Sequence, residues 1–268
     1  MGGVIFLNTL RHTWLQMIYW GVGLGLMALF TAAMVPFFDS MKMVELLQGL
    51  PPILLAAAGL DAELQVLATP EGVITVSFFG KFALVFAAYP VVMGMRISAN
   101  DEDQGVMEVL LSLPLPRWQV IVERFLAYSL SVVGVGALVY GGLWLGVALV
   151  GLTVDMGRMA AVVFNAVPVL IFVLAFTALM AALFRRRRRA LAVTTAFVVA
   201  SFMLDTVAGL VGAGLSQTLR AFSFFSYYDP AGIVQEGLDQ GKTLFISALA
   251  LLLALGSMWA FRRRDVGL

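Results

Sequence analysis

The stretch NDEDQGVMEVLLSLPLPRWQVIVER, residues 100–124, is the one long polar and amphipathic segment in an otherwise strongly apolar chain. Its three consecutive acidic residues, at positions 101–103, suit the first turn of a helix, because the positive end of the helix dipole attracts negative charge. Apolar residues then recur at the spacing of one helical face. Pro114 and Pro116 end the helix, because proline has no backbone N–H to donate. The sequence therefore predicts an amphipathic helix over residues 101–113 that makes contacts in water.

The composition of the whole chain is that of a membrane protein. Of its 268 residues, 61% are hydrophobic and only 12% are charged, whereas about a quarter of the residues in a soluble domain are charged. The chain contains no cysteine, which excludes disulfides, a thiolate nucleophile and a cysteine metal site. We therefore expect an all-α integral membrane protein.

Six apolar segments are long enough to cross a bilayer as helices, which takes about 20 residues each. The amphipathic helix lies between the second and the third of them. Residues 2–13 suit a short interfacial helix, and residues 39–72 and 213–242 are expected to form outer loops. The chain is thus predicted to be one transmembrane domain, residues 1–268, with spans at residues 14–38, 73–97, 125–150, 159–184, 190–212 and 243–261.

Basic residues are concentrated on one side of these spans. Twelve lysine and arginine residues fall on the side that holds both termini and the amphipathic helix, and four fall on the other side. Because basic residues are retained on the cytoplasmic face, both termini are expected in the cytoplasm of a cell-membrane protein. The arginine run at residues 185–189 is then a topology anchor that contacts anionic lipid headgroups, and no nucleic-acid partner is expected.

The segment EDQGVMEVLLSLPLPR, residues 102–117, resembles the pattern E-x-x-G-T-x-E-x-L-L-S-x-P-x-S-R of permease subunits of the ABC transporter type 2 family. Val106 replaces the frequent threonine and Pro116 the frequent serine. The resemblance extends to LPP at residues 50–52, TPEG at residues 69–72, the six spans and the final FRRRDVGL, so it covers nearly the whole chain. In such permeases this coupling helix docks in a cleft of a separate ATP-binding subunit. The docking positions carried over by the resemblance are Glu102, Gly105, Glu108, Leu111, Pro114 and Arg117.

The amphipathic helix allows two interpretations. It could tether two spans along the membrane surface, or it could dock on a protein. Anionic lipid repels a dense acidic cluster, which favours the protein partner. Glu102 and Glu108 are more than one helical turn apart and face different directions, so they do not make the same contact.

The resemblance implies the membrane-spanning subunit of an ATP-driven exporter, which forms the substrate pathway as a homodimer or related heterodimer within membrane lipid. ATP and Mg²⁺ are expected on the partner subunit, and this chain is expected to have no catalytic residue, cofactor or metal. Two features of the sequence agree with the expectation that this chain has no catalytic site. GLDQGKT, residues 237–243, has three residues between its glycines where a P-loop needs four, and His12 is the only histidine.

Two charged residues within the expected spans leave an alternative function open. Lys81 and Asp205 lie at similar depth from the outer face, and burying either without a partner or water is costly. One hypothesis pairs them across the second and fifth spans; otherwise Lys81 extends to the interface and Asp205 faces water. The alternative function is an ion- or proton-coupled secondary transporter that uses both residues, a class that usually shows internal repeats.

A pair of glycines in the first span indicates close helix packing. Gly21 and Gly25 form a GxxxG motif, whose lack of side chains lets two helices approach closely. We expect this pair to offer a packing site for a second copy of the chain.

Overall fold

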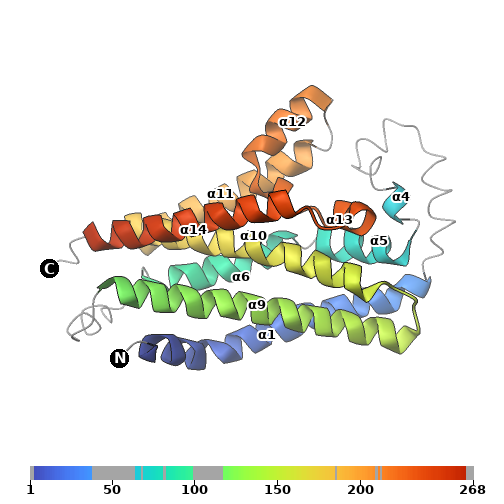
Figure 1. Ribbon diagram of the computed structural model, residues 1–268, viewed down its shortest axis with the longest axis horizontal. Coiled ribbons are helices and arrows are strands. Elements are labelled where there is room, and N and C mark those ends of the chain that lie inside the picture. Colours follow the sequence, from blue (N-terminus) through green and yellow to red (C-terminus); the bar gives the residue numbers. More distant parts are fainter. Residues whose placement is uncertain are drawn as a thin grey trace.

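The computed structural model describes residues 3–37, 64–67, 69–80, 83–98, 117–184, 186–208, 211 and 213–263. Within these ranges all regular structure is helical, and no strand occurs among them, which confirms the expected all-α class. Five helices are long and apolar enough to cross a membrane, and a broken helix pair makes a sixth candidate span. Figure 1 shows these helices running side by side, with the beginning of α1 and the end of α14 at the same end of the bundle.

The two longest helices, α1 (Val4–Met34) and α9 (Arg117–Val150), run parallel along one side of the bundle (Figure 1). With 31 and 34 residues, they are roughly 46 and 51 Å long, well beyond the hydrocarbon core of about 30 Å. The sequence predicts a separate interfacial helix over residues 2–13, whereas the structure continues α1 through most of this segment without a break. Nothing in residues 4–13 is a proline or glycine that would end the helix.

Glycines on both helices produce the close contact between α1 and α9. A Cβ atom at Gly25 would lie 2.8 Å from the carbonyl oxygen of Leu138, and one at Gly146 would lie 2.6 Å from that of Leu29. Gly142 faces the backbone of Gly25 directly. The sequence predicts a contact with a second copy at Gly21 and Gly25, but α9 of the same chain fills the space beside both glycines.

Helix α10 (Met156–Leu183) lies at the centre of the bundle and is the most buried of the long apolar helices among the described residues. It packs against α6 (Ala83–Met95), α9, α11 (Arg187–Ala208) and α14 (Gln240–Arg263). A polar link also joins α6 to α9, because the buried Tyr89 hydroxyl donates a hydrogen bond to Ser131 Oγ at 2.9 Å. Helix α10 thus packs extensively against every other long helix except α1, and the Tyr89 hydroxyl adds a polar contact between two of its neighbours.

The second span, predicted over residues 73–97, is broken in the structure. It consists of α5 (Pro70–Ile74), a π-helical turn (Thr75–Gly80) and α6, and the two parts are bent by 44°. The wider turn changes the backbone hydrogen bonding, and the Tyr228 hydroxyl donates to the Phe79 carbonyl oxygen at 3.0 Å. A distant residue thus supports the break, which explains why a local apolar pattern did not predict it.

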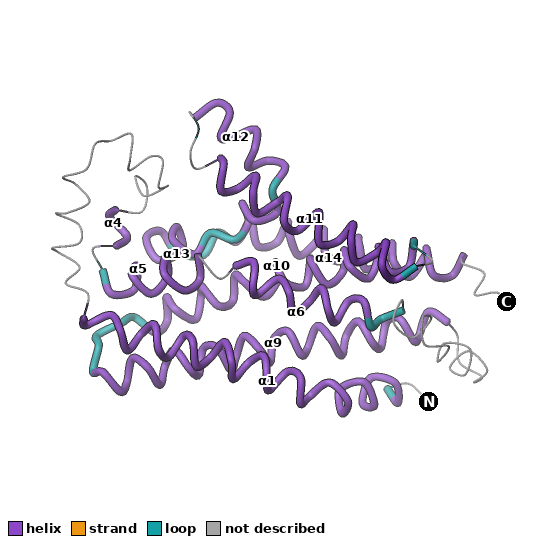
Figure 2. Tube along the Cα trace, turned by 180° about the vertical axis from the view of Figure 1, so that it is seen from behind, coloured by secondary structure: helices purple, strands orange, loops and turns teal. Residues whose placement is uncertain are grey.

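The segment predicted as an outer loop, residues 213–242, is largely helical instead. It contains α12 (Ala213–Phe222), a 3-10 turn (Phe224–Tyr227) and α13 (Pro230–Glu236). Side-chain caps start the two shorter helices: Ser223 accepts from Phe225 N–H, and Asp229 accepts from Gly232 N–H. In both Figure 1 and Figure 2, α12 projects away from the long helices. In the other predicted loop, the described part holds α4 (Leu64–Leu67) and the start of α5.

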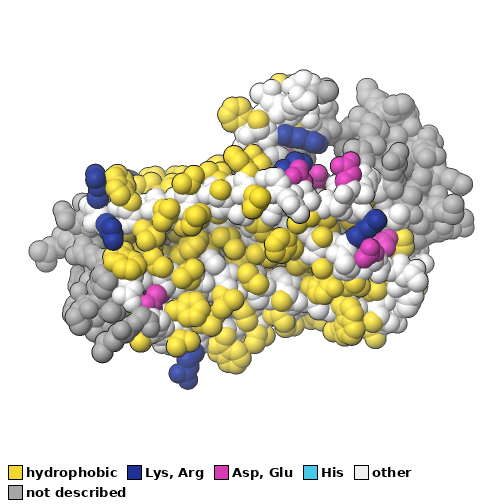
Figure 3. All heavy atoms as spheres, viewed as in Figure 1, with side chains coloured by type: hydrophobic (Ala, Val, Ile, Leu, Met, Phe, Trp, Pro, Cys, Tyr) yellow, Lys and Arg dark blue, Asp and Glu magenta, His cyan; other side chains and the backbone are white. Residues whose placement is uncertain are grey.

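Charged side chains separate to the two ends of the bundle, and Figure 3 shows the broad apolar band between them. The end away from the termini carries ion pairs, with Arg158 Nε 3.5 Å from Asp155 and Lys242 Nζ 3.9 Å from Asp229. The end that holds the beginning of α1, which we call the terminal end, carries mostly arginine. The arginine side chains that the structure describes there are Arg11, Arg96, Arg124, Arg186, Arg187, Arg188, Arg189, Arg262 and Arg263.

Candidate functional site at the terminal end

The predicted coupling helix, residues 101–113, lies outside the described residues, and so do Glu102, Gly105, Glu108, Leu111 and Pro114. Arg117 is the first residue of α9, and its side chain is not described. The structure does describe the two helices that flank this stretch. The described chain stops at the turn after α6 and resumes at the first residue of α9. Both points lie at the terminal end (Figure 1).

Arg124 of α9 holds the end of α6. Its Nη1 donates hydrogen bonds to the carbonyl oxygens of Ile97, at 3.1 Å, and Arg96, at 3.3 Å. The last carbonyls at a helix end lack partners within the helix, and a cation there is favoured by the helix dipole. One side chain of α9 therefore fixes the point at which the chain leaves α6.

The neighbouring residue, Glu123, holds the start of α1. Glu123 is only 8% exposed, and its carboxylate accepts backbone N–H bonds from Gly3 and Phe6, both at 2.9 Å. Gln119 donates a further bond to it at 2.7 Å. Gly3 precedes α1 and has no side chain to cap it, so a carboxylate from α9 supplies the cap from outside the helix.

A third contact closes the group. Arg96 Nη1 donates a hydrogen bond to Gln16 Oε1 on α1 at 2.6 Å. The side chains of Glu123, Arg124, Arg96 and Gln16 thus tie together the start of α1, the end of α6 and the start of α9. We call these four residues the helix-end junction.

Glu123 is a site residue that the sequence did not predict. The available signal was an acidic residue within an arginine-rich border, together with the absence of a capping side chain before α1. That signal is weak because the two halves of the contact lie 120 residues apart.

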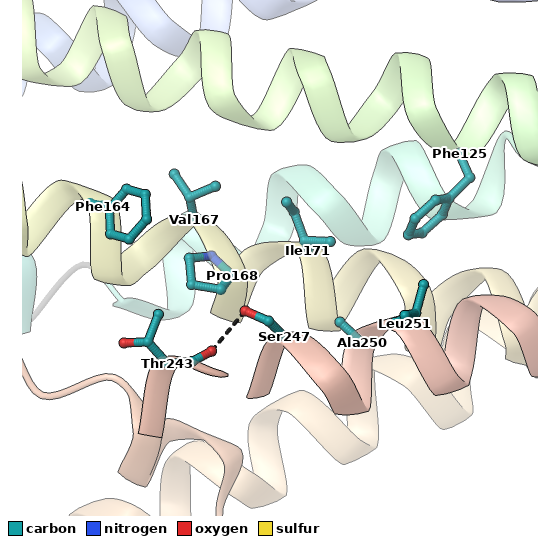
Figure 4. A pocket seen from close by; sticks show the side chains of 9 residues that line it. All are labelled: Phe125, Phe164, Val167, Pro168, Ile171, Thr243, Ser247, Ala250 and Leu251. Atoms are coloured by element: carbon teal, nitrogen blue, oxygen red, sulfur yellow. Dashed lines mark hydrogen bonds between the residues drawn. The ribbon is translucent and has the colours of Figure 1, made fainter. Parts of the chain in front are cut away.

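A second feature is an apolar cavity of about 330 Å³ between α10 and α14. Pro168 lies within α10, and it cannot donate the backbone bond that the carbonyl of Phe164 would otherwise accept. The few hydroxyls are already used: Ser247 Oγ donates to the Thr243 carbonyl at 2.7 Å, as Figure 4 shows. Figure 4 places the lining side chains, which are Phe125, Phe164, Val167, Pro168, Ile171, Thr243, Ser247, Ala250 and Leu251.

This cavity can accommodate an apolar group but offers no charged partner. Its volume lies near the lower end of the range for small-molecule sites. Phe125 comes from α9 and directly follows Glu123 and Arg124, so the cavity and the helix-end junction share one short segment of that helix.

Of the predicted intramembrane pair, the structure describes Asp205 but not Lys81. Lys81 lies outside the described residues, so the structure does not test its contact with Asp205. Asp205 is half-buried on α11, where, among the described residues, Arg220 attracts its negative charge and Asp229 repels it. Among the described residues, no group of three or more His, Asp or Glu side chains is arranged to hold a metal ion.

The long apolar helices, their charged ends and the broken second span define a multi-pass integral membrane protein. A family model described as ABC-2 family transporter protein matches residues 7–266, nearly the whole chain. The chain therefore belongs to the ABC-2 transporter family and is a membrane subunit of an ABC transporter. No curated protein matches the chain.

Proposed function

We propose that this chain is the membrane-spanning subunit of an ATP-driven exporter, working as a dimer and coupled to a separate cytoplasmic ATP-binding subunit. The main support is the coincidence of two findings. Residues 102–117 resemble the docking pattern expected of ABC-2 permeases, and the chain belongs to that family. The helices on either side of that stretch are joined by the helix-end junction, which is suited to receive a movement made there.

The charge distribution supports a cytoplasmic position for the terminal end. The described arginines at this end lie where the positive-inside rule places the cytoplasmic face of a cell-membrane protein. Both termini and the coupling helix then face the ATP-binding subunit, which holds ATP and Mg²⁺. This chain contributes no catalytic residue in the proposal.

The proposed coupling follows from the contacts of α9. A partner that moves the coupling helix moves the start of α9, and Arg124 and Glu123 carry that movement to the end of α6 and the start of α1. The glycine contacts keep α1 against α9, so these two helices move together. Phe125 moves with them and changes the shape of the apolar cavity against α10 and α14.

The substrate pathway is proposed to form with a second copy of the chain or a related permease. A single chain of five or six spans rarely encloses a conduit of its own, and α10 fills the centre of this bundle. Since α9 occupies the face of Gly21 and Gly25, we place the contact between copies on other surfaces. Lipid surrounds the remaining apolar faces.

The test of this proposal is a charge reversal on the coupling helix. We expect Glu108→Arg to insert normally but to lose substrate-stimulated ATP hydrolysis by the copurified complex, because the reversed charge no longer fits the partner cleft. The measurements are membrane insertion, copurification with the ATP-binding subunit and the ATPase rate in nanodiscs.

Glu236→Arg is the matched control, since Glu236 is an exposed acidic residue of α13 at the opposite end of the bundle. It should leave ATPase stimulation intact. Equal stimulation in wild type and Glu108→Arg would count against docking through this helix.

A further inference from the structure

A polar cavity of about 220 Å³ lies at the terminal end, beside the helix-end junction. Helix α1 contributes one wall, while the turn after α6 and the start of α9 contribute the other. The lining residues are Asn8, Thr9, His12, Thr13, Arg96, Arg124 and Tyr128.

The described side chains that line this cavity carry positive charge. Two guanidinium groups, from Arg96 and Arg124, line it, and none of the described lining residues is acidic. The nearby carboxylate of Glu123 does not line the cavity and accepts hydrogen bonds from the start of α1. A guanidinium group carries five N–H donors in a planar fork that matches phosphate oxygens.

The surrounding hydrogen bonds hold these groups in place. Gln16 accepts from Arg96 at 2.6 Å, and the carbonyl of Ile97 accepts from Arg124 at 3.1 Å. His12 Nδ1 lies 2.8 Å from the Asn8 carbonyl oxygen and is the donor in this pair, because a carbonyl oxygen only accepts. The cavity is therefore built from side chains with defined orientations.

Exposed tryptophans place the cavity at the depth of lipid headgroups. Trp14 directly follows the lining residue Thr13 and is about half exposed, at 49%. Arg262 lies over the ring of Trp118 at 6.0 Å, and Arg263 lies over that of Trp259 at 4.2 Å. Tryptophan and arginine side by side at a helix border are typical of the membrane interface.

We propose that this cavity binds the phosphate group of an anionic phospholipid in the leaflet around the terminal end. Basic cavities between membrane helices recognise anionic headgroups in this way. Because Arg96 and Arg124 also belong to the helix-end junction, the bound phosphate holds α1, α6 and α9 together. This binding does not depend on export or on the ATP-binding subunit.

The experiment uses the purified full chain in detergent, with phosphatidylglycerol, phosphatidylcholine or inorganic phosphate added. Retained lipid is measured by native mass spectrometry and stability by the melting temperature. We expect phosphatidylglycerol to be retained and to raise the melting temperature, while phosphatidylcholine does so much less.

Three variants test the residues. Asn8→Asp adds a carboxylate to the cavity with almost no change in shape, near a helix start where an acid is tolerated, and it should weaken phosphatidylglycerol binding about fivefold or more. Arg96→Gln should weaken it as well, and Asn8→Asp remains informative if Arg96→Gln does not fold. Arg11→Gln removes an exposed arginine that does not line the cavity and should leave binding unchanged.

Three results would overturn the proposal. Equal losses in Arg11→Gln and Asn8→Asp would indicate general charge attraction instead of a site. Equal retention of the two lipids would remove the headgroup preference. Stabilisation by inorganic phosphate as strong as that by phosphatidylglycerol would assign the cavity to soluble phosphate.

Discussion

At the scale of single residues, two adjacent side chains of opposite charge each serve a different helix end. Glu123 accepts from the N–H groups that begin α1, and Arg124 donates to the carbonyls that follow α6. Each charge is placed where the dipole of the neighbouring helix favours it. The pair makes the start of α9 the point at which three helices are joined.

The contribution of Glu123 is testable by substitution. We expect Glu123→Ala to lower the free energy of unfolding by about 1 to 3 kcal/mol, because it removes an N-cap and leaves partly buried N–H groups without this partner. Glu123→Gln keeps an acceptor oxygen and should lose less. Unfolding in mixed micelles with increasing SDS measures both, and Glu236→Ala is the control on an exposed acidic residue.

If Glu123→Ala were as stable as Glu236→Ala, the carboxylate would not act as the cap of α1. A loss of similar size in Glu123→Gln would instead show that the negative charge, and not hydrogen bonding alone, stabilises the helix start.

At the scale of elements, the packing of α1 on α9 depends on the absence of side chains at a few positions. Gly142 meets the backbone of Gly25, so an added methyl group cannot be accommodated by a rotamer change. The neighbouring Gly141 faces open space, with no atom within 4 Å of an added Cβ. Alanine substitutions at these two adjacent glycines therefore distinguish the effect of helix packing from the effect of helix propensity.

We expect Gly142→Ala to destabilise the protein by about 1 to 3 kcal/mol through overpacking. Gly141→Ala, the matched control, should be neutral or stabilise by up to about 1 kcal/mol, since alanine favours helix over glycine. The same SDS unfolding assay measures both. Equal behaviour of the two variants would contradict the observed contact between α1 and α9.

At the scale of the whole molecule, the separation of charge between the two ends determines the expected orientation. The chain contains no cysteine, so single cysteines can be introduced without removing native ones. Arg187 begins α11 at the terminal end, and Glu236 ends α13 at the other; both side chains are exposed.

We expect Glu236→Cys to react with a membrane-impermeant maleimide in intact cells, because its end is proposed to face outward. Arg187→Cys should react only after the membrane is permeabilised, and the remaining arginines should preserve the topology. Gel shift of the labelled protein measures the reaction. The opposite pattern would place both termini outside and would contradict docking on a cytoplasmic ATPase.

Much of the architecture was predictable because it depends on local properties. Four of the expected spans overlap α9, α10, α11 and α14 almost fully, since an apolar run of sufficient length forms a helix wherever it lies. The charge separation also follows directly from the residue order. The coupling helix rests on a sequence pattern and stays a prediction, because residues 101–113 lie outside the described part of the chain.

The remaining features depend on partners that are distant in sequence. The Glu123 cap joins residues 120 positions apart, and the bond from Tyr228 to the π-helical turn joins residues 149 positions apart. A GxxxG motif shows that a helix can be approached closely but not which helix approaches it, and here α9 of the same chain does so. The apolarity and charge of individual residues determined the spans and their expected orientation. Which helices become neighbours is decided only when the helices pack. That choice determined the helix-end junction, the break in the second span and both cavities.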